Sequence, residues 1–172
     1  MNRIKFNQNG FTLVEILLVI IIISLLYTII VLIVNPLEVA RQGRDAQRLA
    51  DLSNIRLAMN LTALENSEAL DLYCHNLFPP CSGRSTDPNP RQVNGQGWVK
   101  MNLEAQDKVK MAVLPVDPRN NNSYYYEYAT DNTGVFWEIN TTIESVKFQD
   151  KMFEGGNNDS RYEIGTKLTI LP

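Results

Sequence analysis

The sequence predicts an α+β fold, in which one long, partly transmembrane N-terminal α-helix packs by its C-terminal half on a small antiparallel β-sheet head. Three observations support this prediction. Residues 11–34 form an almost uncharged apolar run, and residues 37–66 keep a helical spacing of apolar side chains. Residues 123–171 contain short runs rich in β-branched and aromatic residues, separated by turn residues. The 172 residues suffice for one soluble domain and one membrane segment.

The apolar run from Phe11 to Val34 is 24 residues long, and Glu15 is its one side chain that is charged at neutral pH. At about 1.5 Å per residue, a helix of this length crosses a hydrocarbon core of roughly 30 Å. A charged side chain deep in a bilayer costs about 2.5 to 3.5 kcal/mol on insertion scales. Glu15 therefore either lies near the interface and reaches water, or has a partner of opposite charge.

The ten residues before the apolar run are polar, carry Arg3 and Lys5, and end in Gly10. A general secretory signal is cleaved after its apolar stretch, behind a small-x-small pattern, and no such pattern follows Val34. The expected processing point is therefore the Gly10–Phe11 bond, before the apolar stretch. Cleavage there leaves the hydrophobic segment on the product.

The segment Gly10-Phe11-Thr12-Leu13-Val14-Glu15 resembles the signature of type IV prepilins and type II secretion pseudopilins. The resemblance implies a pilin-like fold, cleavage between Gly10 and Phe11, and N-methylation of the new terminal Phe11. It also implies a partner for Glu15. The cationic amine that cleavage creates on Phe11 of one subunit can neutralise the Glu15 of its neighbour.

We expect one helix from residue 11 to about 66, with a kink at Asn35-Pro36, because proline removes a helical hydrogen bond. Two helices separated by Gly43 are the alternative. The apolar face of the second half carries Ala46, Leu49, Leu52, Ile55, Met59, Ala63 and Leu64. The expected divisions are a cleaved leader at 1–10, a transmembrane and polymerisation helix at 11–34, its amphipathic continuation at 35–66, and a globular head at 67–172.

The chain has two cysteines, Cys74 and Cys81, and the short segment between them contains two prolines. A disulfide bond closing this loop would contribute about 2 to 3 kcal/mol and would persist only outside the cytosol. Free thiols are one alternative. A zinc site with His75 is another, although it lacks an obvious fourth ligand.

The head is expected to be mainly β-structure. Residues 79–97 read as a loop because prolines and glycines are dense there. The strongest signal is an antiparallel hairpin formed by residues 123–128 and 135–143 around Asp131-Asn132-Thr133-Gly134. Weaker strand candidates are 98–103, 161–164 and 167–171, and 108–113 is a short helical turn or extended segment. The tyrosine-rich run 124–128 either packs on the helix or forms a stacking platform for nucleic acid or sugar.

The segment Leu114-Pro115-Val116-Asp117-Pro118 resembles one found in the major pseudopilins of type II secretion, where it precedes an aromatic strand and a calcium-binding loop. Calcium takes about six to eight oxygen ligands. A purely structural turn is the alternative, because asparagines stand where further carboxylates are expected. No cofactor is required, and the candidate calcium ligands are Leu114, Asp117, Asn120, Asn122 and Asp131.

Composition argues against two functional classes. With a single histidine, no Gly-x-Ser-x-Gly and no phosphate loop, the chain lacks the usual parts of a catalytic site, so we do not expect an enzyme. The chain has 16 Lys and Arg against 19 Asp and Glu, and loss of Arg3 and Lys5 with the leader makes it more acidic. Binding to nucleic acid through bulk charge is therefore not indicated.

We therefore expect a structural subunit of a type IV pilus or pseudopilus, a homo-oligomer in a helical filament. Arg41, Arg44 and Arg48 balance the leader charges, so the positive-inside rule does not set the orientation. The resemblance implies a single-pass protein of the cytoplasmic membrane with an extracytoplasmic head, then an extracellular or periplasmic filament. Its implied partners are a prepilin peptidase and methyltransferase, an inner-membrane pilus assembly platform, and membrane lipid before assembly. The alternatives are a tethered extracytoplasmic binding module that never polymerises, or a minor tip pilin, for DNA or surface ligands.

Overall fold

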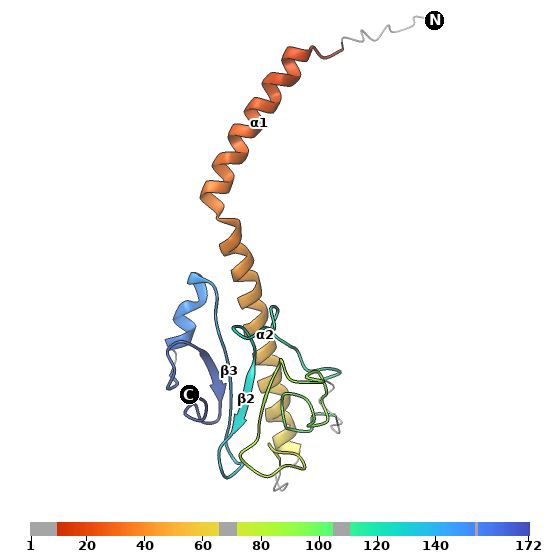
Figure 1. The fold of residues 1–172 in the computed structure, drawn as a ribbon, viewed down its shortest axis with the longest axis vertical. Coiled ribbons are helices and arrows are strands. Elements are labelled where there is room, and N and C mark those ends of the chain that lie inside the picture. The colour runs from red at the N-terminus through yellow and green to blue at the C-terminus, as the bar shows by residue number, and fades with distance from the viewer. Residues whose placement is uncertain (1–9, 66–71, 105–110, 154) are drawn as a thin grey trace, which may run out of the picture. The chain divides into compact units, whose positions relative to one another are not determined.

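The computed structural model describes residues 10–65, 72–104, 111–153 and 155–172 (Figure 1). The first half of the segment 108–113, residues 108–110, lies outside these residues. The fold is α+β with a pilin-like layout, as predicted. The chain divides into two compact units, Met1–Val39 and Ala40–Pro172. Its elements are α1 (Leu13–Val34), α2 (Pro36–Glu65), β1 (Ser82–Arg84), β2 (Glu127–Thr130), β3 (Trp137–Thr141), the 3₁₀-helix η1 (Val146–Phe153) and β4 (Tyr162–Gly165).

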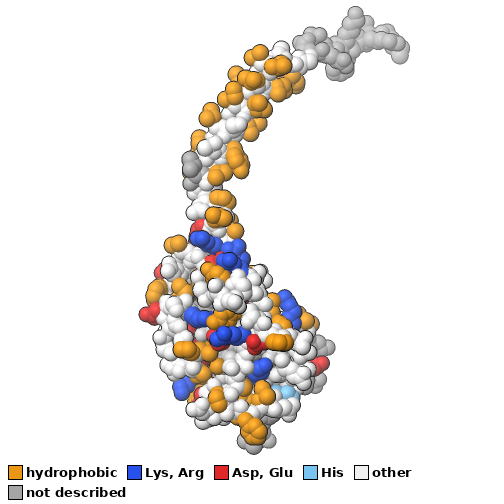
Figure 2. Space-filling view, in the orientation of Figure 1, with side chains coloured by type: hydrophobic (Ala, Val, Ile, Leu, Met, Phe, Trp, Pro, Cys, Tyr) orange, Lys and Arg blue, Asp and Glu red, His pale blue; other side chains and the backbone are white. Residues whose placement is uncertain are grey.

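Helix α1 is aliphatic on all sides, and its described side chains are exposed (Figure 2). Its segment Leu13–Val31 is long and apolar enough to cross a membrane, by length and composition. Two of its hydroxyl groups bond within the helix: Ser24 Oγ donates to the Ile20 carbonyl at 2.7 Å, and Thr28 Oγ1 donates to the Ser24 carbonyl at 2.9 Å. Because these hydroxyls need no water, the helix suits an apolar surrounding.

Helix α1 ends at Asn35, which adopts a left-handed conformation with φ 43°. Asparagine tolerates this conformation better than most residues, and Pro36 can begin the next helix because its first position needs no N–H donor. The Asn35 carbonyl and side-chain oxygen both accept the N–H of Glu38, at 3.0 and 3.3 Å. The chain thus forms two helices where one with a kink was predicted, and the break lies at Asn35 and not at Gly43.

The second unit contains a four-stranded antiparallel sheet in the order β1-β2-β3-β4. The predicted hairpin is present as β2 and β3, in which Tyr128 pairs with Ile139. Its first strand was placed too early, because residues 123–126 form no strand and β2 continues to Thr130. Strand β4 matches the candidate at 161–164, and its Ile164 pairs with Ile139. Residues 167–171 form no strand, and residues 98–103 contribute only an isolated bridge between Asn94 and Asn102.

Strand β1 lies inside the segment that the sequence assigned to a loop. Its Gly83 pairs with Tyr128 and faces the backbone of Trp98, where a Cβ atom would overlap the Trp98 carbonyl oxygen. Glycine is needed here for close backbone approach. This pairing depends on contacts between distant segments, which local composition does not encode.

The core of the second unit forms where α2 packs against the sheet, residues 98–103 and Leu114 (Figure 1). From α2, Leu52, Ile55 and Met59 are fully buried, as the helical spacing predicted. The predicted face was too wide, because Leu64 is 78% exposed and Ala46 is also exposed. The other members of this core are mostly large, and they include Trp98, Leu103, Leu114, Tyr126, Tyr128, Trp137 and Ile139.

The buried tyrosines of the tyrosine-rich run pack inside the protein and form no stacking platform, and the ring of the half-buried Tyr124 is covered by the guanidinium groups of Arg48 and Arg119. Tyr126 and Tyr128 are fully buried, and Tyr125 is nearly so. The Tyr126 hydroxyl donates to Asp51 on α2 at 2.9 Å, and the Tyr128 hydroxyl donates to the Tyr73 carbonyl at 2.6 Å. Buried tyrosines with bonded hydroxyls offer no ring face to a ligand.

Candidate functional site

Gly10 and Phe11 lie directly before α1 and are exposed. A Cβ atom on Gly10 would meet no atom within 4 Å, and its backbone does not require a glycine. Phe11 is 78% exposed. The described structure therefore does not require a glycine at position 10. If glycine is required there, the requirement comes from an enzyme that binds the Gly10–Phe11 bond.

Thr12 and Glu15 form a capping box at the start of α1. Thr12 Oγ1 accepts the Glu15 N–H at 3.2 Å, and the Glu15 carboxylate accepts the Thr12 N–H at 3.5 Å. Together they satisfy two of the amide groups that a helix start leaves unpaired. Sequence reasoning explained Glu15 by its charge alone, although the spacing Thr-x-x-Glu is itself the signal of a capping box.

The carboxylate of Glu15 therefore has a function within its own chain. Its side chain is exposed along with the rest of this turn, so it can also contact a group on another molecule. Cleavage before Phe11 would leave Thr12 and its N–H in place. The capping box is therefore compatible with both the full chain and a chain that begins at Phe11.

The candidate calcium ligands do not come together. Asp131 lies in the turn that follows β2, where its carboxylate accepts the Thr133 hydroxyl at 2.8 Å and the N–H groups of Val135 and Phe136. Desolvation would raise the pKa of Asp131, but these hydrogen bonds outweigh it and lower the pKa. Asn120 lies near the other end of β2, where its side chain bonds Ser85.

Asp117 is also engaged, since both of its carboxylate oxygens accept hydrogen bonds from Arg48. The five candidate residues therefore do not form one coordination shell. Within the described parts of the chain, no group of three or more His, Cys, Asp or Glu side chains could hold a metal ion. Calcium binding stays a prediction.

An ionic cluster lies buried where α2 meets two loops of the second unit. Its centre is Arg48, whose side chain is 0% exposed. Arg48 Nη1 donates to Asp45 at 2.6 Å, and Nη2 pairs with Glu144 at 2.7 Å. Nε and Nη2 donate to the two oxygens of Asp117 at 2.6 and 3.0 Å. This bidentate pair ties the Leu-Pro-x-Asp-Pro segment to the helix.

The charges of the cluster balance. Arg44 donates to Glu144 through Nε at 2.9 Å and Nη2 at 2.7 Å, and Arg119 Nη1 donates to Glu144 at 3.2 Å. Burial would raise the pKa of Glu144, but the hydrogen bonds from Arg44 and Arg48 outweigh it and lower that pKa to about 2. The members are three arginines and three carboxylates, Arg44, Arg48, Arg119, Asp45, Asp117 and Glu144.

Sequence reasoning missed this cluster because it treated Arg48 only as a flanking charge. A signal was present: Arg48 precedes Leu52 and Ile55 by four and seven residues, so it lies on the buried face of the helix. An arginine on that face needs carboxylate partners.

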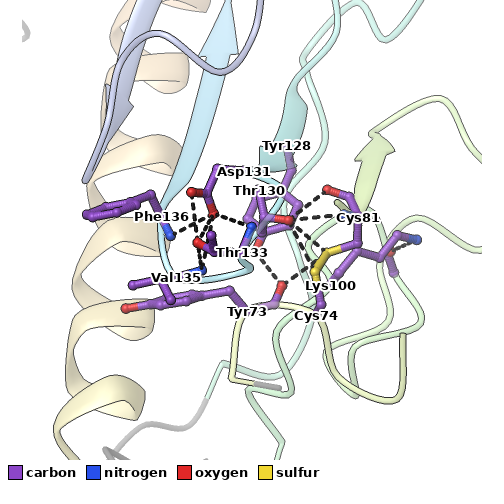
Figure 3. The surroundings of a disulfide bond; sticks show 11 residues. Tyr73, Cys74, Cys81, Lys100, Tyr128, Thr130, Asp131, Thr133, Val135 and Phe136 are labelled. Atoms are coloured by element: carbon purple, nitrogen blue, oxygen red, sulfur yellow. Dashed lines mark hydrogen bonds between the residues drawn. A yellow bond between two sulfur atoms is a disulfide. The ribbon is translucent and has the colours of Figure 1, made fainter. Parts of the chain in front are cut away.

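Cys74 and Cys81 form a disulfide bond (Figure 3). Thr130 at the end of β2 anchors this loop, because its hydroxyl accepts the Cys81 N–H at 3.0 Å. The Thr130 N–H in turn donates to the Cys81 carbonyl at 2.9 Å. The disulfide bond therefore closes the loop, and the hydrogen bonds of Cys81 with Thr130 fix it to the sheet.

Comparison with known proteins adds one finding. Residues 5–32 match the family model described as the prokaryotic N-terminal methylation motif, which is the cleavage motif of type IV prepilins and pseudopilins. The match includes Gly10, Phe11 and Glu15. No curated protein and no solved structure matches the chain.

Proposed function

Because residues 5–32 carry the cleavage motif of type IV prepilins and pseudopilins, we propose that this protein is a structural subunit of a type IV pilus or pseudopilus. A prepilin peptidase cuts the Gly10–Phe11 bond and methylates the new amine of Phe11. The subunit waits in the cytoplasmic membrane as a single-pass protein with an extracytoplasmic head. An assembly platform in that membrane then adds it to an extracellular or periplasmic filament.

The exposed aliphatic surface of α1 is the observation that carries the proposal. A helix that is apolar on all sides needs an apolar surrounding, either lipid or other helices of the same kind. Moving α1 from lipid into a bundle of α1 helices exchanges one apolar surrounding for another, so burial of apolar surface gives little net driving force. Selection between correct and incorrect neighbours must therefore come from packing and from polar groups.

Glu15 supplies the polar group. Its charge is costly in an apolar surrounding, and the Phe11 amine of a neighbouring subunit can neutralise it there. That amine does not exist before cleavage. Processing and assembly are thus coupled, because an uncleaved subunit cannot offer the partner that Glu15 needs.

The capping box allows the charge of Glu15 to be tested apart from its structural function. Glu15→Gln keeps a side-chain acceptor for the Thr12 N–H but removes the charge, whereas Glu15→Ala removes both. We expect both variants to be cleaved and inserted into the membrane, and both to fail in filament assembly. The measurement is the yield of sheared filaments from cells that contain the assembly machinery.

A normal filament yield from Glu15→Gln would show that capping, and not charge, is what Glu15 contributes. Normal yields from both variants would remove Glu15 from the mechanism. Failure of wild-type protein to polymerise under the same conditions would favour a tethered binding module.

A further inference from the structure

Residues 166–172 follow β4 and form no helix or strand, and we call them the strap. Thr166 fixes the start of the strap to β3. Its N–H donates to the Trp137 carbonyl at 3.0 Å, and its hydroxyl accepts the Trp137 N–H at 3.0 Å. Further along, Lys167 and Thr169 are exposed and Leu171 is buried. The strap therefore has a fixed start and a buried anchor beyond an exposed stretch.

Glu138 on β3 holds the part of the strap that carries this anchor. Its Oε2 accepts the N–H of Ile170 at 2.7 Å and the N–H of Leu171 at 3.1 Å. Hydrogen bonds to an ionised acceptor are roughly twice as strong as those between neutral groups. Glu138 is fully buried, however, and a buried carboxylate needs compensation for its charge.

The compensation comes from Glu163 on β4. Glu138 pairs with Gly165, and Glu163 pairs with Asn140, so the two glutamates are diagonal neighbours on one face of the sheet. Diagonal neighbours are close enough for long side chains to meet. Gly165 has no side chain that could separate them. The two carboxyl groups therefore lie together, on the face opposite the one that Ile139 and Ile164 turn to the core.

One oxygen of each glutamate has no other partner. Glu138 Oε1 and Glu163 Oε1 are both buried, and within the described residues neither accepts a hydrogen bond from an N–H group or a hydroxyl group. Two ionised carboxylates in this position would repel each other. A single proton shared between them removes the repulsion and satisfies both oxygens, because a protonated carboxyl group donates to a carboxylate.

The turn before β4 links Glu163 to the strap. Gly156 lies against the Glu163 carboxyl group, and a Cβ atom on it would overlap Glu163 Oε2. Asn158 of the same turn donates its backbone N–H to Glu163 and its side-chain Nδ2 to the Pro172 carbonyl, the latter at 2.8 Å. Displacement of either glutamate therefore disturbs a group that holds the strap.

The surrounding charges leave the compensation to a proton. Within the described residues, neither Glu138 nor Glu163 forms an ion pair. Arg161 precedes Glu163 by two residues, but its guanidinium donates to Asn140 and Tyr125. The remaining charged groups of the adjoining elements are Glu127, which pairs with Arg84, and the exposed side chains Lys147, Asp150, Lys151, Asp159 and Lys167.

We propose that the strap is a pH-sensitive latch, which a proton shared by Glu138 and Glu163 keeps closed on the sheet and which opens more readily once that proton is lost. Opening breaks the two amide bonds to Glu138 and admits water to the carboxyl groups. Water then solvates two negative charges that the closed strap would keep together. This device lies in the second unit and does not depend on the function proposed for α1.

The direction of the pH dependence follows from the pKa of Glu163. Burial raises this pKa, and the charge of Glu138 and the hydrogen bond to it raise it further, to about 7. With the strap open, Glu163 releases its proton nearer its ordinary pKa of 4.5. Closure is therefore favoured fully below about pH 4.5, and this advantage is lost as the pH rises through about 7.

The test is hydrogen exchange of the full chain in detergent micelles, followed by mass spectrometry at about pH 5.5 and about pH 8. Protection factors are corrected for the intrinsic exchange rate at each pH. We expect the protection factor of the strap amides to fall at least about tenfold between the two conditions. At both we expect the strap to be less protected than β3, because it opens without unfolding the sheet.

Two variants separate the latch from general effects of charge. Glu163→Gln keeps a side-chain donor for Glu138 but cannot ionise, so we expect its strap protection to stay within about twofold between the two conditions. Asp150→Asn removes an exposed carboxylate of η1 and is the matched control. It should retain the fall of at least about tenfold seen in wild type.

Three results would overturn the proposal. The first is a fall of less than about tenfold in the strap protection of wild-type protein. The second is equal protection of the strap and β3, which would show that the strap leaves the sheet only when the whole unit unfolds. The third is a fall in Glu163→Gln as large as that in wild type. The first two results require the wild-type protein alone.

Discussion

Among single residues, Gly10 occupies a position where the described structure does not require a glycine. Its position has open space for a side chain, and its backbone is not in the left-handed region. We therefore expect Gly10→Val to leave the second unit folded but to block cleavage by a prepilin peptidase. The measurement is the mass of the protein from cells that contain the peptidase, with the thermal melt of the second unit as control. Normal cleavage of the valine variant would contradict this prediction.

Glu163 on β4 is a residue whose protonation the fold controls. Burial raises its pKa, and the nearby charge of Glu138 raises it further, to about 7. Glu138 is itself fully buried, and its carboxylate accepts the N–H groups of Ile170 and Leu171 at 2.7 and 3.1 Å. The C-terminal segment is thus held by a carboxylate that has a second carboxyl group beside it.

The raised pKa of Glu163 predicts how stability depends on pH. The folded state keeps a proton that the unfolded state releases near its ordinary pKa of 4.5. The proton on Glu163 therefore contributes fully to the free energy of unfolding below about pH 4.5, and this contribution is lost as the pH rises through about 7. We expect Glu163→Gln to flatten this part of the profile. Urea unfolding at several pH values tests it, and an equal slope in wild type and variant would contradict it.

At the scale of elements, the Arg48–Asp117 pair joins α2 to the segment that precedes the sheet. Removing one partner of a buried ion pair leaves an uncompensated charge and costs about 3 to 5 kcal/mol. We expect Asp117→Ala to destabilise the second unit by about that amount. The matched control is Arg84→Ala, which breaks the pair with Glu127 at a side chain that is 52% exposed, and which should cost less than about 1 kcal/mol.

Both variants can be followed by urea unfolding with tryptophan fluorescence. Trp98 and Trp137 are the two tryptophans of the chain and are both buried in the second unit. Equal losses in the two variants would show that the buried cluster is no more important than a surface pair.

The elements also show what the sequence can and cannot predict. The β2–β3 hairpin was predictable because its turn residues and strand residues are adjacent in sequence. Helix α2 and its core-facing Leu52, Ile55 and Met59 followed from spacing. Strand β1 did not, because its pairing requires Gly83 to meet the Trp98 backbone. The burial of Arg48 likewise depends on Asp117 and Glu144, which are far away in the sequence.

In the candidate site too, some features were predictable from the local sequence and others were not. Gly10, Phe11 and Glu15 could be singled out from a local motif. The capping bond between Thr12 and Glu15 was also encoded locally, by the spacing Thr-x-x-Glu. The separation of Asp117 from Asp131 was not, because it depends on the pairing of Asp117 with Arg48, a residue far away in the sequence.

At the scale of the whole molecule, the chain contains two units that need different surroundings. The first is an exposed aliphatic helix, and the second has its own core, sheet, disulfide and buried ionic cluster. The described core residues of the second unit come from α2 and the segments after it. Helix α1 is thus left available for membrane and then for other subunits, as the proposed function requires.

Cleavage at the Gly10–Phe11 bond can be read from the intact mass of the protein extracted from membranes of cells that contain a prepilin peptidase. We predict a chain that begins at Phe11 and carries one added methyl group on its terminal amine. Fragmentation of the N-terminal peptide would place the methyl group. A protein that keeps Met1 through Gly10 in the presence of an active peptidase would contradict the account.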